Sequence, residues 1–331
     1  MELNNMCREK CMGIFMTYKF IGVVPYKSNW SQLFEAEASL IKQKLGDNFL
    51  EIHHVGSTSV PGLCAKPIIV IILVVRNSAE SIDPLELIGF KFKGEMNIPF
   101  RSYFSKKTET PVHLHVYEPG SAEIELNLLF RNFLRSNSKA CAEYTNLKNT
   151  LTEEQKKYKN APPMFSHYTL GKNEFIRKIL QEAGFDKLRL MHCTHYAEWE
   201  AAKAYRQKYF FDKVSIADPY TWTFDHPEHT HFVLYKGTQI IGYAHLQHWK
   251  NQRAAIRIIV IDEAFRNQKY GSYLLELCEK WLKLQGFKSL HVESSPQAYK
   301  FYCRYNYTEM PFNDPDSHES DPQDIEVGKI L

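Results

Sequence analysis

The sequence predicts a two-domain protein of the α/β (α+β) class, in which each domain combines β-strands with α-helices. The length of 331 residues suggests two domains, and each half is long enough to bury its own core. The composition, with 44% hydrophobic and 24% charged residues, is that of ordinary globular domains. Short apolar runs of strand length alternate in both halves with segments of helical periodicity.

The first domain is expected at residues 19–185, after an N-terminal extension over residues 1–18. Ser28 or Asn29 can cap its first helix, and Gly46 can end it. Gly184 can terminate its last helix. In chain order we expect a helix over 29–46, strands over 49–55 and 68–75, a strand followed by a helix within 111–135, and helices over 139–159 and 166–185.

The second domain is expected at residues 186–331. Its hairpin turns at Lys236-Gly237, and its longest helix carries Leu274, Cys278 and Trp281 along one face. In chain order we expect a strand within 188–195, a helix over 196–210, a loop over 218–229, hairpin strands within 231–249, a strand over 254–261, a helix within 267–287, a strand over 290–295 and a helix over 296–305.

Charge and cysteine usage limit the class of protein. A formal net charge of +3 is too small to predict a nucleic-acid partner. The cysteine count of 7 is odd and no Cys-x-x-Cys pair occurs, so we expect reduced thiols in a cytoplasmic protein. The longest apolar run, residues 68–75, is too short to span a bilayer, so no membrane partner is expected. The oligomeric state remains open, and an oligomer is possible.

A strand, a loop and a helix over residues 254–275 form the most informative motif. The strand ends at Ile261, and the loop from Arg266 to Gly271 leads directly into a helix. Free N–H groups at a helix N-terminus suit a pyrophosphate, and a glycine there lets the backbone approach a ligand closely. Further along, Ala298 and Tyr302 lie four residues apart on one helix face.

With these residues the chain resembles the GNAT superfamily of acetyl-CoA-dependent N-acetyltransferases, over about residues 187–312. The family pattern is Arg/Gln-x-x-Gly-x-Gly/Ala after a strand, and here Lys269 stands where the first glycine is usual. A later pattern, Asn-x-x-Ala-x-x-x-Tyr, appears as Ser295, Ala298 and Tyr302. The element order agrees with the family as well. The resemblance implies a mixed sheet with splayed central strands and flanking helices.

The resemblance also implies acetyl-CoA as the cofactor and direct attack of an amine on its thioester. Tyr302 would act as general acid toward the leaving thiolate, a positioned proton transfer of the usual kind. The contacts to acetyl-CoA implied by the family would come from Ile259, Val260, Ile261, Arg266, Asn267, Gln268, Lys269, Tyr270, Gly271, Ser272, Ser295 and Lys300.

The general base is less directly indicated. Many relatives carry a glutamate where this chain has Ala255, so another residue or a water chain must take the proton. His226 is the first choice, and a packed or surface role is the alternative for any one histidine here. The remaining candidates are Asp225, Glu228, His229, His231 and His245.

Aromatic and acidic residues of the loop over 218–229 favour a cationic amine as acceptor. Trp222, Asp225, Glu228 and His245 are the expected contacts. The second domain is similar to aminoglycoside acetyltransferases of the kasugamycin type, which implies an aminoglycoside substrate and antibiotic resistance. A polyamine, a protein N-terminus and a lysine are the alternative acceptors. The tail over 312–331 carries six acids and is either solvated or docked over the site.

The first domain contains a second turn that suits a phosphate. Gly56 and Ser57 open it, and Lys66 follows before an apolar strand. Together with the blocks at 23–30, 53–69, 113–125, 128–135, 144–151 and 168–176, this turn resembles the GrpB family, whose fold is that of the nucleotidyltransferases. The resemblance covers about residues 19–180 and implies a nucleotide-like pocket at Gly56, Ser57 and Lys66.

The residues that would hold a metal are altered. Val70 and Ile72 stand where carboxylates would bind magnesium, so we expect a degenerate site without metal. Asn127 and Asn132 replace the expected His and Asp, while Glu123 and Glu125 would share a strand face if that stretch is extended.

Three functions therefore compete. The first is an acetyltransferase whose GrpB-like domain binds a nucleotide or serves as scaffold. The second is a nucleotidyltransferase with relocated acids and a regulatory GNAT part. The third is a binding protein without catalysis.

Overall fold

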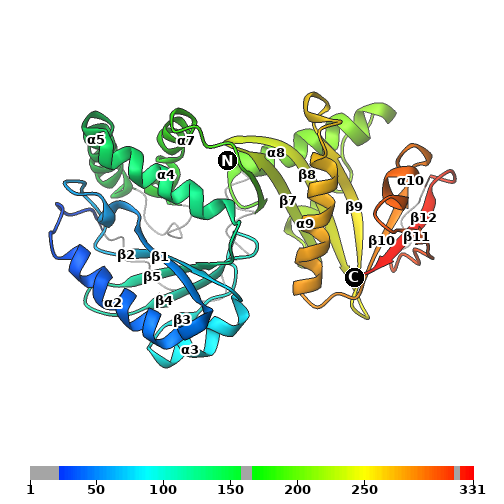
Figure 1. The fold of residues 1–331 in the computed structure, drawn as a ribbon. Helices are drawn as coiled ribbons and strands as arrows, with labels where there is room; N and C mark the ends of the chain where they lie inside the picture. Colours follow the sequence, from blue (N-terminus) through cyan, green and yellow to red (C-terminus); the bar gives the residue numbers. More distant parts are fainter. Residues whose placement is uncertain (1–21, 158–165, 317–320) are drawn as a thin grey trace. The chain divides into compact units, whose positions relative to one another are not determined.

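The computed structural model describes residues 22–157, 166–316 and 321–331, and it divides into two compact units between Arg189 and Leu190 (Figure 1). The expected extension over 1–18 lies outside the described residues. Each unit is built around one β-sheet, of 5 strands in the first and 7 in the second. Among the described helices, none is long and apolar enough to cross a membrane. The two-domain α/β prediction is confirmed.

The first unit is a mixed sheet with helices. Its strand order is β1-β2-β5-β4-β3, with β2 and β5 parallel and the other neighbours antiparallel. Its elements are α2 (Trp30–Leu45), β1 (Phe49–Val55), β2 (Ile69–Val75), α3 (Ile82–Leu87), β3 (Lys91–Phe92), β4 (Ser102–Lys106), β5 (Val112–Tyr117), α4 (Ala122–Ser136), α5 (Ser138–Gln155), α6 (His167–Leu170) and α7 (Asn173–Glu182).

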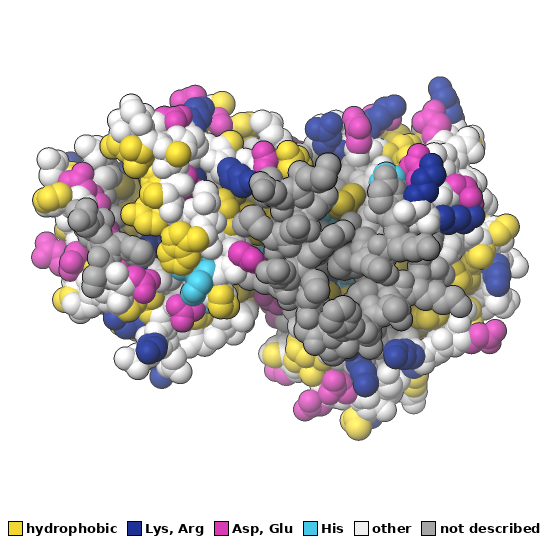
Figure 2. Space-filling view, turned by 180° about the vertical axis from the view of Figure 1, so that it is seen from behind, with side chains coloured by type: hydrophobic (Ala, Val, Ile, Leu, Met, Phe, Trp, Pro, Cys, Tyr) yellow, Lys and Arg dark blue, Asp and Glu magenta, His cyan; other side chains and the backbone are white. Residues whose placement is uncertain are grey.

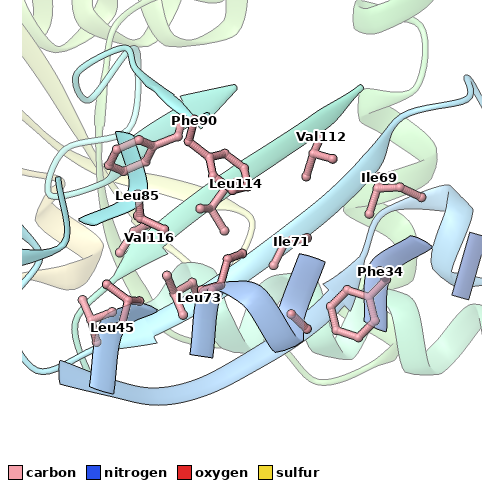
Figure 3. Packing of buried hydrophobic residues seen from close by; sticks show 14 of the residues in the cluster. Phe34, Leu45, Ile69, Ile71, Leu73, Leu85, Phe90, Val112, Leu114 and Val116 are labelled. Carbon is pink, nitrogen blue, oxygen red and sulfur yellow. The ribbon is translucent and has the colours of Figure 1, made fainter. Parts of the chain in front are cut away.

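Strand β2 explains why the run at 68–75 is apolar without alternation. Its odd residues, such as Ile71 and Leu73, pack with Phe34 of α2 in the cluster of Figure 3. Its even residues, such as Ile72, pack on the other side with Leu128 of α4. A strand covered on both faces is expected to be continuously hydrophobic.

Two local expectations in this unit are wrong. The single helix expected over 166–185 is divided into α6 and α7 around Gly171, where an added Cβ would lie 2.4 Å from Leu151 Cδ2. Glu123 and Glu125 do not share a strand face, because both lie in α4. Two helical positions two residues apart are rotated by about 200° around the helix axis, so their side chains point to nearly opposite sides of the helix.

The second unit has the strand order β11-β12-β10-β9-β8-β7-β6, with β9 and β10 parallel. Its elements are β6 (Leu188–His192), α8 (Tyr196–Arg206), the short helix η7 (Thr221–Asp225), β7 (His229–Lys236), β8 (Gln239–Trp249), β9 (Arg253–Ile261), α9 (Tyr270–Leu284), β10 (Ser289–Ser294), α10 (Pro296–Cys303), β11 (Thr308–Glu309) and β12 (Ile325–Ile330).

The central strands β9 and β10 separate toward their C-terminal ends. Their pairing ends at Ile256 and Val292, although β9 continues to Ile261 and β10 to Ser294. A bulge at Arg257 bends β9 at the same place, since the pairing with β8 passes from Ile256 to Ile258. Bulges commonly occur next to active sites. The expected splayed strands are confirmed, and the gap leaves backbone groups of β9 open to a ligand.

The C-terminal tail is part of the sheet. Strand β12 pairs with β10 from end to end, and its Val327 is completely buried. The sequence predicted a solvated or a docked tail, and this strand was not predicted.

Acidic and basic side chains are mixed over the face shown in Figure 2, in agreement with the small net charge of +3.

Candidate active site

A pocket of about 670 Å³ lies where β9 and β10 separate. One wall comes from β9, from the end of β10 and from α10, and it includes Val260, Ser295 and Tyr302. The opposite wall comes from α8, the segment around η7, and the hairpin of β7 and β8, and it includes His229 and His245. Two chemically different walls can hold two reactants against each other, which is the main requirement of a group transfer.

The loop before α9 has the geometry of an anion site. Lys269 has a φ of 66° and precedes the first residue of α9. This left-handed conformation favours glycine, which gives a physical reason for the usual glycine at that position. Arg266 Nε donates to the carbonyl oxygen of Ile261 at 3.0 Å and so ties the loop to the strand end. The first N–H groups of α9 have no partners within the helix and face outward from its N-terminus.

The predicted cofactor residues fall into two groups. Ile259, Val260, Arg266 and Ser295 line the pocket. The others lie close by in sequence: Ile261 at the end of β9, Asn267, Gln268 and Lys269 in the loop, Tyr270, Gly271 and Ser272 in the first turn of α9, and Lys300 in α10. The opened strand, the helix N-terminus and the pocket size fit a coenzyme A thioester; these residue roles stay predictions.

Tyr302 lines the pocket and is buried. Burial, with a smaller contribution from Cys278, raises the pKa of its hydroxyl above the usual value. The phenol therefore keeps its proton across the physiological range. It can donate that proton to a developing anion, as the sequence analysis proposed.

Arg206, which lines the pocket, forms a buried ion pair with Asp218. Arg206 is 1% exposed; its Nε lies 2.5 Å from Asp218 Oδ2 and its Nη2 lies 2.9 Å from Asp218 Oδ1. The remaining nitrogen, Nη1, lies 3.1 Å from His245 Nδ1. An arginine held at both ends in this way is a rigid donor.

Three histidines of β7 and β8 stack beside this pair. His231 pairs with His245 across the hairpin, with ring centroids 4.2 Å apart, and His229 Nδ1 lies 2.7 Å from His245 Nε2. His231 is held separately, by the Tyr243 hydroxyl and the Thr223 carbonyl oxygen. Burial, followed by neighbouring positive and titratable groups, lowers the pKa of His245 well below its usual value. This histidine is therefore neutral in the fold.

Only one of the residues predicted to bind the acceptor lines the pocket. His245 lines the pocket, whereas His226, Trp222, Asp225 and Glu228 are not among the lining residues. Helix η7 buries Thr223 and Phe224 and leaves Trp222 46% exposed, which turns this side of the loop outward. The choice of His226 as base stays a prediction, with His229 and His245 in more direct contact with the pocket.

Several pocket residues were not predicted. Arg257 and Glu293 come from β9 and β10, and Asp321 and Asp324 come from the segment before β12. The sequence placed the two aspartates in an acidic tail and predicted no contact for them. The one feature that pointed to the pocket was the mixture of acidic and apolar residues in the tail, from which docking over the site was one of two alternatives.

In the first unit the Gly56 turn is held by hydrogen bonds within the turn itself. Gly56 has a φ of 68°, and its carbonyl oxygen accepts from the backbone N–H and the hydroxyl of Ser59. A Cβ at Gly56 would lie 3.2 Å from Val70, so the apolar side chain of Val70 fills the space beside the turn. Arg135 donates to the carbonyl oxygen of Ser59 through both Nε and Nη2. Among the described residues, no cluster of three metal-ligating side chains occurs.

A group of lysines lies around Tyr168 in the same unit. The ammonium groups of Lys66 and Lys172 lie 4.3 and 4.7 Å from the centroid of the same Tyr168 ring. Burial, together with the charges of Lys66 and Lys148, lowers the pKa of Lys172 to about 8. Positive charges gathered in this way favour an anion nearby.

Comparison with known proteins assigns both units. Residues 20–182 match the family model described as GrpB protein. A UPF0157 protein of Halalkalibacterium halodurans is 36% identical over 166 residues, which cover 49% of this chain and 82% of that protein. The chain belongs to the GrpB family. A crystal structure of the conserved protein GrpB from Enterococcus faecalis is similar to this GrpB domain, with 36% identity, 49% of this chain and 96% of that chain covered, and a TM-score of 0.43.

The second unit is a GNAT acetyltransferase domain. Residues 190–307 match the model described as acetyltransferase (GNAT) family. A putative N-acetyltransferase from Lactobacillus plantarum is similar at 22% identity, with 44% of this chain and 99% of that chain covered and a TM-score of 0.38. The GrpB-family chain is therefore an N-acetyltransferase that uses an acyl-CoA.

Proposed function

We propose that the GNAT domain transfers the acetyl group of acetyl-CoA to an amine of a small polycationic acceptor, with an aminoglycoside as the first choice. The observation that supports this proposal is the charge of the pocket. Asp321 and Asp324 line it, and of its three arginines Arg206 and Arg257 pair with carboxylates. Arg266 belongs to the loop predicted to hold acetyl-CoA and Lys213 is exposed, so the two aspartates can bind an ammonium group of the acceptor.

The chain's own residues supply positioning and proton transfer. Acetyl-CoA would provide the thioester carbonyl at which a C–N bond forms as the C–S bond breaks. Tyr302 would give its proton to the departing sulfur, because burial keeps that hydroxyl protonated. Asp324 would accept one proton of the acceptor's ammonium group, and the second proton that the nitrogen loses as the amide forms would return to the Tyr302 oxygen. Burial, followed by the nearby Asp321, raises the pKa of Asp324, which makes it a better proton acceptor than an ordinary aspartate.

The test is incubation of the full chain with acetyl-CoA and a panel of amines, followed by mass spectrometry. The panel contains several aminoglycosides, spermidine and a peptide with a free N-terminus and a lysine. We expect a mass increase of one acetyl group on an aminoglycoside. Acetylation of the peptide alone would contradict the small-molecule proposal, and no acetylation of any amine would contradict the proposed acceptor class as a whole.

We also propose that the GrpB domain binds the phosphate of a nucleotide without a metal ion. The support is the pair of ammonium groups on the Tyr168 ring, in a domain where Val70 offers no carboxylate for magnesium beside the Gly56 turn. A phosphate placed between the two lysines would relieve their mutual repulsion.

A further inference from the structure

Arg206, His245 and His229 form a continuous hydrogen-bonded chain that ends at a pocket-lining residue, His229. Arg206 Nη1 lies 3.1 Å from His245 Nδ1, and His245 Nε2 lies 2.7 Å from His229 Nδ1. The last atom, His229 Nε2, is buried and has no hydrogen-bond partner among the described residues. His229 is 6% exposed and lines the pocket.

The chemistry of the three groups fixes every proton in this chain. A guanidinium only donates, so His245 Nδ1 must accept and carries no hydrogen. A neutral His245 then carries its hydrogen on Nε2 and donates it to His229 Nδ1. His229 Nδ1 therefore accepts, and the single hydrogen of a neutral His229 lies on Nε2. The unpartnered ring nitrogen of this pocket-lining histidine is therefore an N–H donor and not a lone pair.

The surroundings maintain this arrangement. Asp218 holds the guanidinium of Arg206 from the other side, so the first donor is fixed in position. Burial, followed by the charges of His226 and Arg257, lowers the pKa of His229 to about 3, although Asp316 acts in the opposite direction. His229 therefore stays neutral at physiological pH, and its low pKa together with the hydrogen on Nε2 argues against it as the general base.

We infer that His229 is a specificity residue whose Nε2–H group binds an oxygen atom of the acceptor, and that Arg206 and His245 position it by fixing its tautomer. A buried donor without an acceptor is unfavourable by itself, so a ligand oxygen at this place gains a hydrogen bond at little cost. The acceptor is then an amine that also carries a hydroxyl or ring oxygen, as an amino sugar does, and not a polyamine without oxygen. This inference rests on the proposed function for the identity of the pocket's ligand.

The tautomer can be measured without any substrate. The full chain is labelled with ¹⁵N-histidine, and the ring signals of His229 are assigned by their loss in H229Q. We expect hydrogen on Nε2 and none on Nδ1, without titration between pH 5 and pH 8. An unprotonated Nε2, or a titration near the ordinary histidine pKa, would overturn the inference even if the enzyme acetylates an aminoglycoside.

The specificity can be measured with two probes, kanamycin and spermidine. For H229A we expect kcat/KM for kanamycin to fall about tenfold, mainly through KM, with spermidine changed by less than about twofold. H229Q keeps an N–H donor and should recover part of the loss with kanamycin. Equal losses with both amines would overturn the inference. If neither amine is acetylated, the proposed acceptor class fails, and the NMR experiment still decides the tautomer.

Discussion

Lys148 shows how one side chain can reduce the stability of a domain. It is 1% exposed, and its ammonium group donates to the carbonyl oxygen of Cys64. Burial lowers its pKa to about 8, against a small opposite effect of Cys64 and Cys141. Because the charged form is disfavoured in the fold, folding is penalised as long as Lys148 is protonated.

We predict that this penalty disappears as the pH rises. The penalty is complete below pH 8, decreases between pH 8 and 10.5 as the folded chain loses the proton first, and amounts to at most about 3 kcal/mol. In K148M, the rise in stability between pH 8 and 10.5 that urea unfolding measures should be smaller, and Lys172, whose pKa is also lowered to about 8, should contribute the rest. The matched control is the exposed Lys157, whose K157M variant should follow the wild type. Parallel pH profiles of K148M and wild type would contradict the prediction.

At the scale of elements, β12 brings the acidic tail to the pocket. Strand β12 pairs with β10, and the residues just before it, Asp321 and Asp324, line the pocket wall. The tail is also held at Asp314, which lies 2.7 Å from Arg257 Nη2. Because these tail carboxylates line the pocket, they can bind a cationic acceptor without a separate lid segment.

We predict that D321N raises KM for a cationic acceptor about tenfold, because one carboxylate beside the ammonium is lost. The increase should shrink at high salt, since exposed charge interactions are screened. The control is E309Q, which removes an exposed acid of β11 that does not line the pocket. Steady-state kinetics at two ionic strengths measures both effects. An unchanged KM in D321N would contradict a role of the tail in acceptor binding.

The elements that could be read from the sequence are those with a local signal. Strand β2 is a continuous apolar run, and α9 has one hydrophobic face, so both were predicted within a few residues. Strand β12 was not, because six residues within an acidic tail carry little pattern and only their pairing with β10 defines the strand. In the same way Tyr302 was found through a motif. The contact of Arg206 with His245 joins residues 39 apart and arises only from the fold.

At the scale of the whole molecule, each unit has its own sheet and its own buried core. The cluster around Trp30 and Leu114 belongs to the first unit, and Tyr243 and Leu282 are buried in the second. Units with separate cores can unfold separately, and a ligand stabilises the unit that binds it. The competing functions can therefore be distinguished by measuring which ligand stabilises which unit against thermal unfolding.

Scanning calorimetry of the full chain should show two transitions. Acetyl-CoA at a hundredfold excess over its Kd should stabilise the GNAT transition by about 2.7 kcal/mol and leave the other unchanged. ATP should stabilise the GrpB transition to the same degree with and without magnesium, because Val70 and Ile72 provide no metal ligand. K172M, which removes one of the two lysines at Tyr168, should weaken the effect of ATP while preserving that of acetyl-CoA. Stabilisation by ATP that requires magnesium, accompanied by release of pyrophosphate, would instead support a nucleotidyltransferase with relocated acids.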